Sequence, residues 1–581
     1  MARECREQIY SEDYLDYLVE YFLDEEERLG IEENCYNIAS NRFAVVYREG
    51  KEYMQDPLVG INMIPHCYGL LSSEQVLEAT GVTRVRNRPG LELFGTGVLL
   101  GFIDTGIDYA HPAFIGDDGK SRILSIWDQT VELPREEDVV PSFGYGVEYS
   151  GEKINEALNS TDPLSIVPER DENGHGTFLA GVACGSGNYE VDFNGVAPLG
   201  SICVVKCKEA KQNLRDYFFI STEEPCYAES DIMLGIRYLF QKARDYNMPL
   251  VICLGMGTNQ GGHNTGGMLG EMLQEYGDYR GIYVISSTGN EANTSHHYQN
   301  DALEQRESIE AEVRVDEAES GFTMELWTNA TDLYSVGMIS PDGEYSGKTE
   351  ARLGERREIR FLFENTVVYI EYLLNAYENG DECIRMRFQN PSAGIWRIRV
   401  FNDNNYSSRF DLWLPMKEFL KGDTFFLRPE PNTTICEPGN NEGIITCGSY
   451  NPENRAVYVE SGRGFTRVND IKPDFVAPGV NIFGPLRLVG TYPKNEEERR
   501  EFARYGVRTG GSISAAVTAG VTALLAEWAI LRENDPAMDT GKAKKYLIRG
   551  TDKNGLLIPN RIYGNGILDL YGVYDNLRPR P

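Results

Sequence analysis

Basic residues are scarce in this sequence. Its 56 Lys and Arg residues face 89 Asp and Glu residues, which gives a formal net charge of −33 at pH 7. A surface of that sign repels phosphate backbones and anionic lipid, so we expect neither nucleic acid nor membrane insertion. The negative charge favours encounters with cationic or neutral substrates, but it does not identify a substrate.

Long apolar runs are missing too. A helix that crosses a bilayer takes about 20 apolar residues, and no uninterrupted run of that length occurs in the chain. The N-terminus, MARECREQIYSEDYLDYLVEYF, carries acids throughout and lacks the basic-then-apolar pattern of a secretion signal. We therefore expect a soluble protein without a secretion signal, located in the cytoplasm.

Paired cysteine spacing is also absent. The 11 cysteines are odd in number, and none shows the CxxC spacing of a structural zinc site. Several lie in apolar runs, such as Cys203 in SICVVKC and Cys253 in LVICLG. Buried reduced thiols in a reducing compartment explain these better than a disulfide framework. We assign no metal and no cofactor.

Most of the chain has an α/β pattern. Its 581 residues exceed one ordinary core, so two to four units are expected. From about residue 91, the apolar runs VLLGFID, SICVVK, LVICLG and IYVISS are typical of buried parallel strands. Helical stretches such as DIMLGIRYLFQKARDY lie between them. This alternation predicts a parallel sheet with helices on both faces.

A different pattern interrupts this α/β text. In CIRMRF and IWRIRV, apolar residues alternate with arginine, and Asn, Gly, Asp and Pro clusters separate further runs of this kind. Short half-buried strands at this spacing predict an antiparallel β-sandwich. The insert has roughly 110–130 residues, a common domain size. The α/β pattern then resumes with GIITCGSY and the long apolar helix SAAVTAGVTALLAEWAIL.

The N-terminal region differs from both. It opens with an acidic helical pattern over residues 14–22, followed by one strand-like run, FAVVY. We therefore divide the chain into an N-terminal segment (1–90), a first α/β part (91–302), the inserted sandwich (303–430) and a second α/β part (431–581).

Histidine is the rarest residue with general-base chemistry. Of the six histidines, His175 lies in DENGHGTFLAGV, between glycines and at the start of a helical run. Such a position favours a chemical role over packing alone. The others are interpreted as loop residues; His296 and His297 are expected to form an exposed pair that is solvated and binds no metal.

Hydrolysis of an amide also needs a nucleophile, an acid that orients the base, and donors for the oxyanion. Asp104 ends the strand VLLGFID, where sites assemble in parallel sheets; its alternative role is a turn or helix cap. Ser512 follows two glycines and precedes a long helix. Its alternative is a helix cap, for which Ser514 competes. Asn290 follows a strand and a glycine, and its alternative is a turn.

The segments DTGID, HGT, GVAP, TGNE, KPDFVAPG and GGSISAA, in this order, resemble the subtilisin-like serine proteases. The resemblance covers about 91–300 and 431–575 and implies the three-layer subtilisin fold. It also implies that Asp104 orients His175, the general base for Ser512, and that Asn290 serves the oxyanion hole. Gly255, Met256 and Gly257 look like the edge strand that binds an extended peptide.

The sandwich insert, together with GFIDTGIDYAHPAF and YGNGILDLYGV, resembles the Csp germination proteases of clostridial spores. That resemblance implies a jelly-roll-like insert, a spore-associated location, and activation of a spore-cortex hydrolase zymogen by limited proteolysis. It further implies an N-terminal propeptide that the enzyme cuts itself and that can stay bound. We place the cut near residues 68–72; the alternative is that the segment is never cut. Some Csp paralogues have lost triad residues and act in signalling, whereas all three are kept here.

Some positions depart from the family pattern. GGS replaces the usual GTS, Ile513 replaces Met, and Ala516 and Val517 replace Pro and His. The last two extend an apolar helix and remove no reacting group. Two alternatives stay open: a regulatory or scaffold protein whose triad is occluded, and a general intracellular subtilase unconnected with spores.

Overall fold

The computed structural model describes residues 14–20, 35–38, 43–50, 74–131, 143, 145–352, 355–373, 380–490 and 492–577. The chain divides into two compact units, residues 1–70 and 71–581. This division differs from the predicted boundary at residue 90. Helices α2 (Glu74–Ala79) and α3 (Val82–Arg86) account for the difference, because their apolar side chains join the largest core of the second unit.

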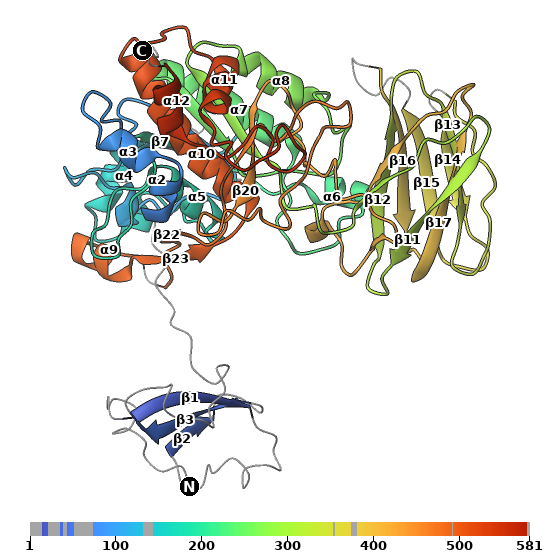
Figure 1. Ribbon diagram of the computed structural model, residues 1–581, viewed down its shortest axis with the longest axis horizontal. Coiled ribbons are helices and arrows are strands. Elements are labelled where there is room, and N and C mark those ends of the chain that lie inside the picture. Colours follow the sequence, from blue (N-terminus) through green and yellow to red (C-terminus); the bar gives the residue numbers. More distant parts are fainter. Residues whose placement is uncertain are drawn as a thin grey trace. The chain divides into compact units, whose positions relative to one another are not determined.

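The first unit contains an antiparallel sheet in the order β1-β3-β2 (Figure 1). Its strands are β1 (Tyr14–Glu20), β2 (Cys35–Ile38) and β3 (Phe43–Glu49). The strand predicted at FAVVY is confirmed as β3. The helix predicted over residues 14–22 is wrong, since β1 pairs with β3 along its whole length. Pairing with a distant segment overrides the local spacing there. The predicted cut near residues 68–72, and His66, lie outside the described residues.

The second unit is built on an eight-stranded sheet in the order β21-β20-β9-β8-β4-β7-β5-β6. All neighbours are parallel except β6, which pairs antiparallel with β5 at one edge. The strands are β4 (Leu99–Asp104), β5 (Ile123–Asp128), β6 (Val147–Ser150), β7 (Ser201–Lys206), β8 (Leu250–Leu254), β9 (Ile282–Ser287), β20 (Ile445–Tyr450) and β21 (Phe475–Pro478).

Helices cover both faces of this sheet, which confirms the predicted three-layer fold (Figure 1). Along β4, Leu100 and Phe102 join a core with α5 (His175–Cys184) and α10 (Gly511–Ala526). Leu99 and Ile103 face the opposite side and pack with α7 (Glu229–Asp245) and α8 (Met268–Gly277). The strand is buried on both faces, which explains its uninterrupted apolar sequence.

Among the described residues, the helix over Gly511–Leu531 is long and apolar enough to cross a membrane. However, 89% of its most apolar window is buried inside the protein, where it forms the centre of the core. The smaller elements of the second unit are α4 (Gly151–Leu158), α6 (Gln212–Phe218), β22 (Ile482–Leu486), α9 (Glu496–Phe502), β23 (Arg504–Arg508), α11 (Thr540–Gly550) and α12 (Leu570–Leu577).

The insert is an antiparallel sandwich, as predicted. One sheet has the order β10-β18-β12-β16-β15-β14 and the other β13-β17-β11-β19, and a single apolar core draws on both. It begins before the predicted residue 303, because β10 pairs with β18. The strands are β10 (His297–Gln299), β11 (Ser308–Val315), β12 (Gly321–Thr328), β13 (Tyr334–Ile339), β14 (Arg356–Arg360), β15 (Val367–Leu373), β16 (Glu382–Gln389), β17 (Gly394–Asn402), β18 (Asp411–Trp413) and β19 (Phe425–Phe426).

Cysteines in the described part of the second unit are buried free thiols, Cys203 and Cys253 among them, in line with the expectation from their apolar surroundings. Burial raises the pKa of Cys203 and Cys253 above the ordinary value of a thiol. These thiols are therefore unreactive packing groups.

Candidate active site

Asp104 and His175 form the first contact of the site. Asp104 is the last residue of β4 and is 1% exposed, while His175 begins α5. The Nδ1 of His175 lies 2.8 Å and 3.0 Å from the two carboxylate oxygens of Asp104. Because a carboxylate only accepts, the proton of the neutral ring is assigned to Nδ1, and Nε2 carries the lone pair.

Ser512 forms the second contact of His175, so that Asp104, His175 and Ser512 lie in a row. It lies in the first turn of α10, and its Oγ is 2.8 Å from Nε2 of His175. The lone pair of Nε2 can accept the hydroxyl proton, so the imidazole bridges a carboxylate and an alcohol. The competing serine, Ser514, is buried and its Oγ lies 2.6 Å from Oγ of Ser449. Thus only Ser512 of the two faces the histidine.

Asn290 lies beside this row. Its Oδ1 accepts a hydrogen bond of 2.9 Å from the backbone N–H of Gly511, which turns the amide into one orientation. Its Nδ2 has no hydrogen-bond acceptor among the described residues, and Asn290 and Ser512 line the same cavity of about 750 Å³. The N–H of Ser512, in the first helical turn, also lacks an intrahelical acceptor. Two donors are thus available beside the hydroxyl.

The three predicted substrate-binding residues, Gly255, Met256 and Gly257, follow β8 and line the same cavity. A Cβ on Gly255 would lie 2.6 Å from Cδ1 of Leu179 and 3.1 Å from Cε1 of His175. A side chain at residue 255 would therefore push against the imidazole. The structure places this segment next to the site; its role in binding peptide stays a prediction.

Asp171 is a residue that sequence reasoning missed. Its Oδ1 accepts from Gly174 N at 2.7 Å, its Oδ2 accepts from Thr177 N at 2.8 Å, and Thr105 Oγ1 donates to Oδ1 at 2.7 Å. These bonds hold the first turn of α5, which carries His175. The signal was available: an aspartate shortly before a predicted helix is a typical cap.

The pKa of His175 is raised above its ordinary value of 6.5. Burial is the largest influence and acts to lower it, but the charges of Asp104 and Asp171 and the hydrogen bond that His175 Nδ1 donates to Asp104 outweigh burial. Asp171 therefore acts on the base in two ways, through the helix turn and through its charge.

The prediction that His296 and His297 are exposed is wrong. They are 5% and 1% exposed, at the start of the sandwich. Nδ1 of His296 lies 3.0 Å from Glu291, and Nε2 of His297 lies 2.9 Å from Asp411. The sequence has no signal for this burial, because it arises where the insert packs on the α/β part.

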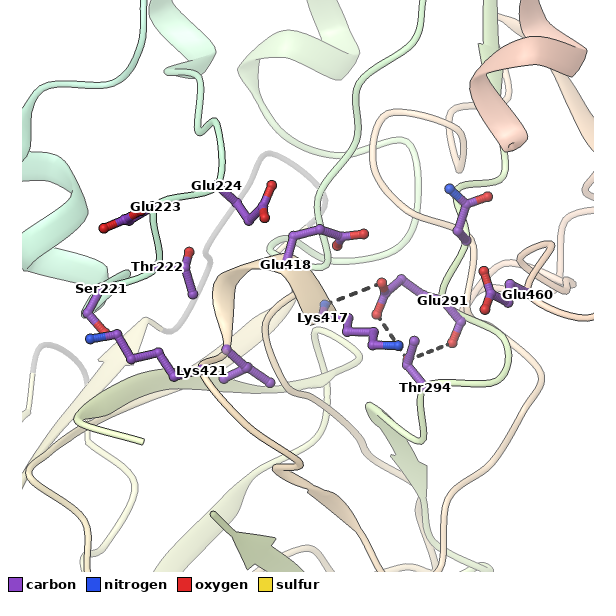
Figure 2. A pocket seen from close by; sticks show the side chains of 12 residues that line it. Ser221, Thr222, Glu223, Glu224, Glu291, Thr294, Lys417, Glu418, Lys421 and Glu460 are labelled. Atoms are coloured by element: carbon purple, nitrogen blue, oxygen red, sulfur yellow. Dashed lines mark hydrogen bonds between the residues drawn. The ribbon is translucent and has the colours of Figure 1, made fainter. Parts of the chain in front are cut away.

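Glu291 anchors the loop that carries Asn290. Its carboxylate accepts from Thr294 Oγ1 and from Asn259 Nδ2, each at 3.0 Å, and from the backbone N–H of Lys417 at 3.4 Å. Figure 2 shows two of these bonds in a hollow of about 710 Å³ that Asn290 also lines. Four glutamates from other segments also line this hollow: Glu223, Glu224, Glu418 and Glu460.

The sandwich insert also holds a loop of the cavity. Glu325 of β12 accepts from Gly261 N at 3.0 Å, and Asp381 accepts from Asn264 Nδ2 at 2.6 Å. Arg467, from the second α/β part, donates from Nε to Gly262 O at 2.7 Å and also bonds to Asp381. The loop between β8 and α8 is thus fixed from two directions.

Three comparisons relate this site to known proteins. The subtilase family (Peptidase_S8) matches residues 95–334 and 422–566, and the gap lies within the sandwich. The structure of the Clostridium perfringens CspB protease has a TM-score of 0.74 and 32% identity, covering 87% of this chain and 99% of that chain.

Two curated proteins are similar over shorter stretches. Serine protease AprX of Bacillus subtilis (strain 168) is 36% identical over 143 residues, 23% of this chain and 30% of AprX. Subtilisin-like protease SBT2.2 of Arabidopsis thaliana is 31% identical over 134 residues, 20% of this chain and 15% of that protein. The match therefore spans less than a third of either protein's length. The family match covers both α/β parts around the site, and the chain belongs to the subtilase family of serine proteases.

Proposed function

We propose that the protein is an endopeptidase that uses Asp104, His175 and Ser512 as a catalytic triad. The observation that carries this proposal is the position of His175, whose two ring nitrogens each lie 2.8 Å from a partner, Asp104 Oδ1 and Ser512 Oγ. An imidazole held in this way can take the proton of Ser512 at Nε2 and later give it to the leaving group, while Asp104 stays ionised.

In the first half of the reaction, Nε2 of His175 takes the proton of Ser512 while Oγ attacks the substrate carbonyl. The oxyanion accepts from Nδ2 of Asn290 and from the N–H of Ser512. The imidazolium, stabilised by Asp104, then gives its proton to the leaving amine. In the second half, water repeats these steps and releases the carboxylic acid from the acyl-enzyme.

We further propose that the substrate is the zymogen of a spore-cortex hydrolase, activated by limited proteolysis during germination. Support comes from the similarity to the CspB protease over nearly the whole of that chain, and from the segments that resemble Csp germination proteases. Incubating the purified zymogen with the wild type tests this: a single new N-terminus and gain of cortex hydrolysis are expected, and neither with Ser512→Ala.

The N-terminal segment is proposed to act as a bound propeptide. The division of residues 1–70 from the rest as a compact unit supports this proposal. N-terminal sequencing and co-purification after expression test it: a cut in the wild type that is missing in Ser512→Ala, with both pieces eluting together, is the expected result.

The alternative is a regulatory or scaffold protein in which the triad is occluded. A fluorophosphonate probe separates the two, because it labels only an accessible, activated serine. Labelling of the wild type and its loss in Ser512→Ala and His175→Ala, with unchanged circular dichroism, favour the peptidase. A folded but unlabelled wild type favours the scaffold. Expression outside sporulation would instead favour a general intracellular subtilase.

A further inference from the structure

The cavity beside Ser512 has walls that are poor in side chains. Gly255 and Gly257 line one side and Gly289 lines the other. Both sides approach Cys436: a Cβ on Gly257 would lie 3.0 Å from Cβ of Cys436, and one on Gly289 would lie 2.3 Å from its Sγ. Because these lining residues are glycines, the cavity presents backbone, free of side chains, to the substrate residue next to the attacked carbonyl.

Glu437 comes directly after Cys436 and lines this cavity. Its backbone is fixed, because Thr258 N donates to Glu437 O at 2.9 Å and Glu437 N donates to Thr258 O at 2.8 Å. Its side chain packs against Gly261, where an added Cβ would lie 3.1 Å from Cγ of Glu437. The carboxyl group is thus held in place at the wall of the cavity.

The carboxyl of Glu437 is only partly compensated by the protein. Its Oε1 is closed off from solvent and has no hydrogen-bond partner among the described residues. Burial raises its pKa to about 8, although backbone N–H groups of His263 and Asn264 act in the opposite direction. A buried acceptor without a partner is costly, and a ligand that supplies a donor removes this cost.

The two neighbouring arginines, Arg467 and Arg385, form their hydrogen bonds with groups other than Oε1 of Glu437. Arg467 lowers the pKa of Glu437 from a distance, but its guanidinium bonds to Gly262 O and Asp381. Arg385, which lines the cavity, donates from Nε to Glu325 at 2.9 Å. In addition, carboxylates outnumber cations along the cavity wall, which disfavours an acidic substrate residue.

We propose that Glu437 determines specificity for the residue whose carbonyl is attacked (P1), and that it selects a long side chain ending in N–H groups, such as lysine, arginine or glutamine. This inference rests on the proposed peptidase function. An apolar P1 residue would leave Oε1 of Glu437 without a donor. Sites built to hydrogen-bond a substrate group strongly reject analogues that lack that group.

The test uses the full chain and a library of proteome-derived peptides whose cleaved bonds are read by mass spectrometry. Matched peptides that differ only at P1 (Lys, Gln, Met or Glu) then give kcat/KM. We expect the Lys or Gln peptide to be cut at least tenfold faster than the Met peptide, and the Glu peptide slowest. A Lys advantage indicates an ion pair, and a Gln advantage indicates a hydrogen bond to the neutral acid; either supports the proposal.

Variants locate the effect. In Glu437→Leu the ratio of Lys or Gln to Met cleavage is expected to fall at least tenfold, whereas Glu453→Gln, an exposed surface change, keeps it. Fluorophosphonate labelling checks that each variant is folded. A wild type that prefers Met or shows no preference overturns the proposal without any variant, as does a Glu437→Leu protein that keeps its preference. A protein that neither cuts nor labels overturns the peptidase function itself.

Discussion

The amide oxygen of Asn290 accepts a hydrogen bond of 2.9 Å from the backbone N–H of Gly511, the residue before Ser512. This bond joins the loop after β9 to the start of α10, two segments more than two hundred residues apart in sequence. It also leaves the NH₂ of Asn290 as the group that can face a developing oxyanion. The proposed nucleophile, Ser512, and the proposed oxyanion donor, Asn290, therefore hold one another in position.

Replacing Asn290 tests this arrangement. Asn290→Ala is expected to lower kcat by about 10²–10³ with little change in KM, because the lost donor acts mainly in the transition state. Asn293→Ala, an exposed change in the same loop, is the matched control. Equal kinetics for the two variants would exclude Asn290 from the oxyanion hole.

Asp171 is expected to act as a positioning residue. Its charge raises the pKa of His175, and activity requires the neutral imidazole. Asp171→Asn should therefore move the acid limb of the kcat/KM profile to lower pH. It should also lower stability by about 1 kcal/mol, because the amide nitrogen cannot accept one of the hydrogen bonds that hold the first turn of α5. A purely structural role would lower stability and leave the acid limb where it is in the wild type.

Gly255 leaves no room for a side chain beside the imidazole. Gly255→Ala is expected to lower kcat/KM by about 10², because displacing a reacting group by about 1 Å has an effect of that size. Gly541→Ala adds a Cβ whose nearest neighbour lies 3.6 Å away, so it should leave activity unchanged. Wild-type kinetics in Gly255→Ala would show that the loop moves freely.

Glu291 links stability to pH. Burial acts to raise its pKa, but hydrogen bonds from His296, Asn259 and Thr294 and the charge of His296 outweigh burial, so the folded pKa is below 4.5. Its stabilising effect is therefore complete above the unfolded pKa and is lost as the pH falls through the folded value. Urea unfolding should show Glu291→Gln destabilised by about 1–3 kcal/mol at pH 7, with a smaller difference at pH 4. A difference that grows towards acid would contradict this sign.

Local patterns predicted much of the fold. The apolar run VLLGFID became β4, and the two-residue alternation of CIRMRF and IWRIRV became β16 and β17. A strand buried on both faces is apolar throughout, and a strand buried on one face alternates between apolar and polar residues. Either pattern can be read from the segment alone. The helix predicted over residues 14–22 was wrong, because the pairing of residues 14–20 with β3 depends on a partner strand that local spacing does not reveal.

Residue types and their immediate neighbours determined which side chains could do chemistry: a histidine between glycines, an aspartate ending a strand, and a serine opening a helix. Only the tertiary structure decided that they meet, that His296 and His297 are buried, and that Asp171 and Glu437 adjoin the site. The physical reason is that hydrogen bonds and burial depend on distances between segments, and those distances are set by packing of the whole unit.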